Sequence, residues 1–73
     1  MYTKENAKAK LLGLMASMFS REVPSSEVEM LDIALGEQER YLMEDYGVTY
    51  DDILPWEDEF WYNPNNGYKI IPA

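Results

Sequence analysis

The sequence contains neither cysteine nor histidine, and both absences narrow what the protein can do. Without cysteine, disulfide bonds and thiolate metal sites are excluded. Without histidine, the chain lacks the commonest general base and the commonest ligand for transition metals. Basic residues are also scarce, since six lysines and arginines stand against fourteen aspartates and glutamates, a net charge of −8. Direct binding to nucleic acid or to an anionic membrane is therefore not expected.

The chain is also short and has no long apolar run. Its 73 residues suffice for one domain, which we expect to span residues 1–73. No stretch reaches the ~20 apolar residues of a membrane span, and we expect a cytoplasmic protein. A chain this small buries only about 60% of the surface it exposes when unfolded, so a partner or a second copy would add stability. Apolar residues still make up 47% of the sequence, which indicates a folded domain.

The apolar spacing predicts a mainly α domain of two or three helices. Thr3 can cap a first helix that runs to about Ser20, and this amphipathic pattern fits better than a secretory leader. Its apolar face consists of Ala7, Leu11, Leu14, Met15 and Met18. Beyond Pro24, Ser26 with Glu29 predicts a capping box for a second helix. That helix ends at Gly47, and its apolar face consists of Val28, Leu31, Ala34, Leu35, Gln38 and Leu42.

A short third helix and an aromatic tail are expected after Gly47. Thr49 with Asp52 predicts a capping box, and Pro55 should end this turn or open another that has residues 57–59 at its N-terminus. Residues 60–62 and 68–71 are aromatic or β-branched and flank the turn-rich residues 63–67. This pattern predicts a short C-terminal β-hairpin, or an extended aromatic tail, packed on the helices.

Acidic and aromatic residues overlap along the chain. Residues 22–59 hold thirteen carboxylates, and eight of the ten aromatic residues lie between Tyr41 and Tyr68. The densest part, residues 51–59, has five carboxylates around Trp56. Its spacing does not match a calcium-binding loop, so no metal or other cofactor is expected. One short segment also cannot place two carboxylates on either side of a substrate, so we do not expect an enzyme.

An acidic surface for a basic partner protein is the functional interpretation of these residues, and simple solubility is the alternative. On the second helix, Ile33 and Met43 fall among acids, as in an interface with an apolar centre and a charged rim. Trp56 can belong to the core or to the interface. The candidate partner-binding residues are Glu29, Asp32, Ile33, Glu39, Met43, Glu44, Asp51, Asp52, Trp56, Glu57, Asp58 and Glu59.

A row of small residues on the first helix leaves two interpretations open. Ala9, Gly13 and Ser17 recur every four residues. They could let a second copy approach closely in a homodimer, or make room for Trp56 or Trp61 of the same chain.

These features predict a small acidic inhibitor or modulator that binds a protein with a basic surface. The partner would be a nucleic-acid-binding protein, and the chain would mimic the nucleic acid. By composition alone, the chain is like small accessory proteins of phages and mobile elements, such as anti-restriction and anti-CRISPR inhibitors. The alternative is an assembly subunit that forms a homo-oligomer through apolar stripes on its helices. No motif of a known family is present.

Overall fold

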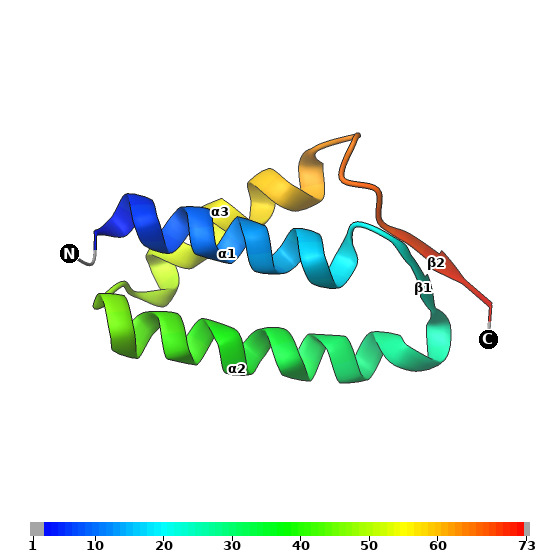
Figure 1. Ribbon diagram of the computed structural model, residues 1–73, viewed down its shortest axis with the longest axis horizontal. Helices are drawn as coiled ribbons and strands as arrows, with labels where there is room; N and C mark the ends of the chain where they lie inside the picture. Colours follow the sequence, from blue (N-terminus) through cyan, green and yellow to red (C-terminus); the bar gives the residue numbers. More distant parts are fainter. Residues whose placement is uncertain (1–2, 73) are drawn as a thin grey trace.

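The computed structural model describes residues 3–72, which form three α-helices and two short strands (Figure 1). The first helix, α1 (Lys4–Phe19), begins as predicted, because the Thr3 side-chain oxygen accepts a hydrogen bond from the Asn6 N–H at 3.1 Å. Its buried residues are Ala7, Leu11, Met15 and Phe19, one every four residues. That spacing places them in one stripe along the helix, which faces the core.

The second helix, α2 (Val28–Tyr46), ends as predicted but begins differently. Gly47 has a left-handed φ of 68°, and its N–H donates to the Met43 carbonyl at 3.0 Å. The predicted capping box of Ser26 and Glu29 is wrong, because a 3₁₀ turn, η1 (Ser25–Glu27), precedes the helix, and Glu27 makes no side-chain cap bond. The backbone of Glu27 is already helical, so 3₁₀ hydrogen bonds replace the cap.

The third helix, α3 (Tyr50–Tyr62), is longer than expected. Its capping box of Thr49 and Asp52 is confirmed. Pro55 neither ends nor restarts the helix but lies inside it. The lost backbone hydrogen bond costs roughly 3 kcal/mol. The helix nevertheless continues, because a helical backbone on both sides of Pro55 lets Ile53 and Phe60 pack into the core.

The mainly α fold is confirmed, but of the two alternatives predicted for the C-terminus the hairpin is wrong, because the strand of the tail pairs in parallel. Residues 60–62 complete α3, and the Asn66 side-chain amide donates to the Phe60 carbonyl at 3.1 Å beside the helix end. After Gly67 (φ 78°), strand β2 (Lys69–Ile71) pairs in parallel with β1 (Glu22–Pro24). Parallel strands need a long crossover, which α2 and α3 supply here. A pairing across 47 positions of sequence leaves no local signal.

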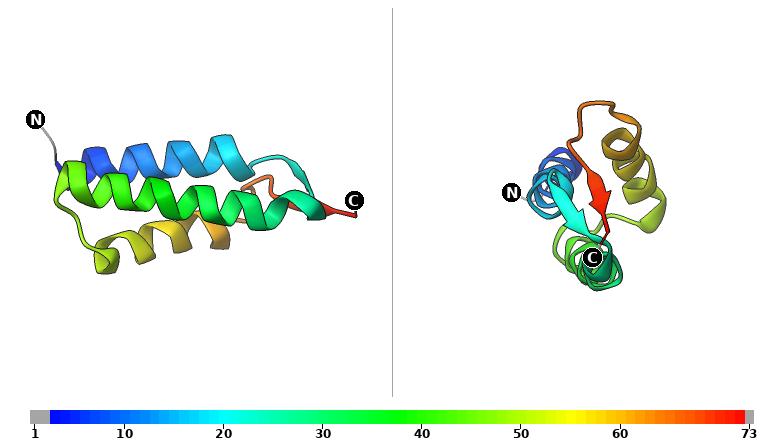
Figure 2. Two further views of the ribbon diagram at one scale, coloured as in Figure 1. Left: turned by 90° about the horizontal axis from the view of Figure 1, so that it is seen from below. Right: turned by 90° about the vertical axis from the view of Figure 1, so that its right-hand side faces the viewer.

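The three helices lie side by side, and the strand pair closes one end of the molecule (Figure 2). α1 packs against both α2 and α3, whereas α2 and α3 touch each other less. The core consists of Ala7, Leu11, Met15, Phe19, Leu35, Leu42, Val48, Ile53 and Phe60. The ring of Trp61 lies 5.1 Å from that of Phe19 and 5.2 Å from that of Tyr68, so aromatic residues join the tail to the helices as expected. Over residues 3–72, no helix has the length and apolarity to cross a membrane.

Candidate protein-binding surface

The outward side of α2 mixes exposed apolar and acidic side chains. Met30 and Ile33 are 67% and 60% exposed, and Tyr41 is about half exposed. Helical spacing places these residues on the side opposite Leu35 and Leu42. We call this surface the outer α2 face; it consists of Glu29, Met30, Ile33, Glu37, Arg40, Tyr41 and Glu44. Ile33 therefore lies where the sequence predicted it, among acidic residues.

Within residues 3–72, no ion pair neutralises a carboxylate of α2. In residues 3–72, the carboxylates that form ion pairs are Glu27, Asp52 and Glu59. None of these belongs to α2. The one basic residue of α2, Arg40, lies over the Tyr41 ring, 5.6 Å from its centre. The exposed acids of α2 therefore present their charge to solvent, and these are Glu29, Asp32, Glu37, Glu44 and Asp45.

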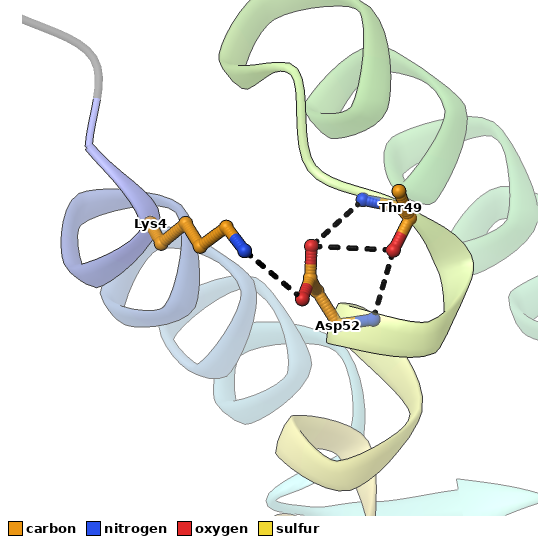
Figure 3. A network of polar contacts seen from close by, with 3 residues as sticks. All are labelled: Lys4, Thr49 and Asp52. Atoms are coloured by element: carbon orange, nitrogen blue, oxygen red, sulfur yellow. Dashed lines mark hydrogen bonds and ion pairs between the residues drawn. The ribbon is translucent and has the colours of Figure 1, made fainter.

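Residues 51–59 do not form the continuous acidic surface that the sequence suggested. Lys4 of α1 contacts Asp52 at 3.4 Å, and Lys8 contacts Glu59 at 2.9 Å. Asp52 also accepts hydrogen bonds from Thr49, and these bonds and Lys4 hold the Asp52 pKa below its usual value (Figure 3). Because α1 lies along this side of α3, its lysines neutralise part of the segment.

Asp51 and Asp58 are the two acids of this segment that remain exposed and outside the ion pairs of the described chain. The acidic charge free to meet a partner is therefore concentrated on α2 rather than on residues 51–59.

Glu39 and Glu57 are buried, although both were predicted to lie on the surface. They are 8% and 7% exposed. Each stands four residues after one core residue and three before another: Glu39 between Leu35 and Leu42, Glu57 between Ile53 and Phe60. Since such neighbours share a helix face, the spacing of the sequence already contained this signal. The helical projection that put Glu39 on the acidic side was wrong.

The two buried carboxyl groups form a pair between α2 and α3. The pKa of Glu57 is raised to about 8. Burial is the largest cause, and the hydrogen bond to Glu39 and the charges of Glu39 and Asp58 add to it. Glu57 Oε2 has no hydrogen-bond partner in the described chain. The charge of Glu39, with smaller effects of burial and Glu57, raises the pKa of the half-exposed Tyr50, so this phenol lies near the pair.

Met43 and Trp56 lie differently from the rest of the predicted interface. Both are half-buried and pack against the core, so they are less available to a partner than Ile33.

The row of small residues on α1 is exposed, so one of its two interpretations fails. A Cβ on Gly13 would meet nothing within 4 Å, so the row makes no room for Trp56 or Trp61.

Chemistry at a metal or in a cavity has no support in the described part of the chain. Residues 3–72 contain no cluster of three or more carboxylates placed to hold a metal ion, and no pocket.

No known family model matches the sequence, and no curated protein or solved structure is significantly similar to it.

Proposed function

We propose that the protein binds a basic surface of a partner protein through the outer α2 face and so blocks the binding of nucleic acid there. The observation that carries this proposal is the row of exposed carboxylates on α2, which no ion pair of the described chain neutralises. Nucleic-acid-binding surfaces present lysine and arginine to phosphates, and carboxylates offer them charge of the same sign.

Apolar contacts must contribute to the affinity as well as charge. Duplex DNA carries one charge per about 1.7 Å of its axis. The 19 residues of α2 span roughly 28 Å and carry five exposed carboxylates, three of them on the outer α2 face, so the charge density is lower than that of DNA. Met30, Ile33 and Tyr41 provide apolar area between these charges. A surface with an apolar centre and a charged rim is typical of protein interfaces.

The exposed apolar residues of α2 also favour a second candidate, a homo-oligomeric assembly subunit. Ile33 and Met30 would be covered in such an assembly. However, pairing this face with itself would bring rows of carboxylates together, and like charges in an interface cost several kcal/mol. The charge therefore favours a basic partner over a second copy, and sedimentation at low and high salt tests this choice.

Affinity capture with charge-reversed variants tests the proposed function. The immobilised protein is exposed to nuclease-treated lysate of the source cells and washed at low and then high salt. We expect a nucleic-acid-binding protein that high salt releases. Glu37→Lys with Glu44→Lys should abolish its capture. Glu5→Lys with Glu22→Lys, the same charge change on other exposed residues, should weaken it far less.

Two results would contradict the proposal. One is equal capture by the two double variants. The other is a captured protein that binds this chain and its nucleic acid at the same time, because mimicry requires competition for one surface.

A further inference from the structure

One flank of α3 has a buried acid at the centre of an exposed apolar row. Tyr50, Leu54 and Trp61 are 50%, 46% and 36% exposed. Leu54 stands three residues before Glu57 and Trp61 stands four after it, so these two are its direct neighbours on the helix surface. We call Tyr50, Leu54, Glu57 and Trp61 the α3 flank. It borders α2 at Glu39, on the side away from the lysines of α1.

A buried carboxyl oxygen without a partner is costly, commonly by about 1–3 kcal/mol. Glu57 Oε2 is such an atom, in a residue more than nine-tenths buried. Within the described chain, the titratable groups beside Glu57 are the carboxyls of Glu39 and Asp58 and the phenol of Tyr50. Lys4 and Lys8 of α1 bond instead to Asp52 and Glu59, and Lys10 lies over the Tyr46 ring of α2. No cation of the described residues therefore pairs with Glu57 or Glu39. A proton on Glu57 neutralises that carboxyl instead.

We propose that the α3 flank binds an arginine side chain carried on an apolar helical segment of the partner protein. Glu57 and Glu39 would accept hydrogen bonds from its guanidinium. This inference rests on the proposed function, because it assumes a basic protein partner. It adds a specific contact at a second surface, in which the charge is hidden until the partner arrives.

Arginine fits this site better than lysine. A planar guanidinium can donate to two carboxyl oxygens at once and can stack on aromatic rings such as those of Tyr50 and Trp61. Leu54 and Trp61 would contact the apolar residues around the arginine and exclude water from the ion pair. As the guanidinium enters, Glu57 turns outward, its O–H bond breaks and the proton passes to water or buffer, so the guanidinium takes the place of the proton beside the carboxylate.

Proton-linked binding of a defined peptide tests the inference. The probe is an 18-residue amphipathic helix with one arginine at the centre of its leucine side and two arginines on the opposite side, and its matched control has citrulline in place of the central arginine. Isothermal titration in two buffers of different ionisation enthalpy gives both the affinity and the protons released. Glu57→Gln and Glu37→Gln are compared with the wild type, with circular dichroism to confirm that each is folded.

We expect the probe to release close to one proton per molecule bound at pH 7. Its affinity should rise up to tenfold per pH unit between pH 6 and 7.5, because the ionised form of the pair binds much more tightly than the protonated form. Glu57→Gln should remove the proton release and lower the affinity at pH 8 at least tenfold, yet match the wild type at pH 6. Glu37→Gln should keep the pH dependence. Replacing the central arginine of the probe with citrulline should abolish the pH dependence of binding.

The outcomes separate the inference from the proposed function. If the probe binds with salt dependence but Glu57→Gln and citrulline change nothing, the α3 flank is not the arginine site and the outer α2 face still stands. If Glu37→Gln weakens binding more than Glu57→Gln at pH 8, the inference is likewise overturned. If the probe does not bind at all, both the inference and the preference for a basic partner fail.

Discussion

At the scale of single residues, Glu39 and Glu57 are the exception in an otherwise apolar core. The two carboxyl groups face each other between α2 and α3, and Glu57 Oε2 is left without a partner. Two apolar side chains there would fold at least as well, because burying carboxyl groups costs free energy unless they are fully hydrogen-bonded. Buried polar groups without full hydrogen bonding concentrate at functional sites, which makes the Glu39–Glu57 pair a candidate for a functional role.

Glu57 makes stability depend on pH. Its pKa rises from 4.5 in the unfolded chain to about 8 in the folded protein. The folded state therefore holds this proton more tightly, and the stabilisation that results is complete below about pH 4.5 and is lost as the pH rises to 8. Glu57→Gln stays neutral at every pH. In urea denaturation, we expect it to match the wild type near pH 4.5 and to exceed it at pH 8.5 by about 1–3 kcal/mol.

Glu37→Gln, a change of an exposed glutamate on α2, is the matched control and should follow the wild-type pH profile. If the curves of Glu57→Gln and wild type run parallel from pH 4.5 to 8.5, the raised pKa of Glu57 is refuted.

At the scale of elements, the helix ends of α2 and α3 are set by a few local residues. Gly47 ends α2 in a conformation that a side chain disfavours, and Thr49 with Asp52 starts α3 two residues later. Gly36, in contrast, lies in the middle of α2, and a Cβ there would meet nothing within 4 Å. The two glycines of one helix therefore have opposite effects on its stability.

The same substitution at these two glycines should act in opposite directions. Gly36→Ala should raise the free energy of unfolding by about 0.5–1 kcal/mol, because alanine restricts the unfolded chain and favours the helix. Gly47→Ala should lower it by roughly 1 kcal/mol, because a Cβ strains the left-handed conformation. Thermal melts followed by circular dichroism measure both. Equal signs for the two variants would mean that α2 does not end at Gly47.

At the scale of the whole molecule, the charges are distributed unevenly: ion pairs join α1 to α3, and unpaired acids lie on α2. Lys4 and Lys8 of α1 bind α3 at Asp52 and Glu59, whereas the acids of α2, all exposed except Glu39, form no ion pair in the described chain. The strand pair β1–β2 joins the end of α1 to the end of the chain beyond α3. The fold therefore neutralises part of α3 and leaves α2 as its most acidic side.

Salt should stabilise the whole molecule. A net charge of −8 repels itself in the compact state, and ions screen this repulsion. Two ion pairs between α1 and α3 would weaken in salt, but exposed pairs contribute little. We expect the free energy of unfolding in urea to rise by roughly 1 kcal/mol between 10 and 500 mM NaCl.

Glu37→Lys with Glu44→Lys should reduce this effect, because it changes the net charge from −8 to −4. A loss of stability with salt would show instead that the α1–α3 ion pairs outweigh the repulsion.

The sequence by itself determined the features that depend on near neighbours. Thr3, Gly47 and the pair Thr49–Asp52 act through bonds to residues at most four positions away, and each was predicted correctly. The mainly α fold and the apolar stripe of α1 follow from the same short-range spacing. The exposed position of Ile33 was predicted on this basis as well.

Only the tertiary structure decided the features that join distant parts of the chain. The parallel pairing of Val23 with Ile70 and the continuation of α3 through Pro55 depend on packing that no local pattern encodes. The same holds for the candidate surface: Lys4 and Lys8 neutralise acids about fifty positions away, and Glu39 meets Glu57 across two helices. A count of charges in the sequence cannot tell which are exposed, because burial and pairing are properties of contacts between elements.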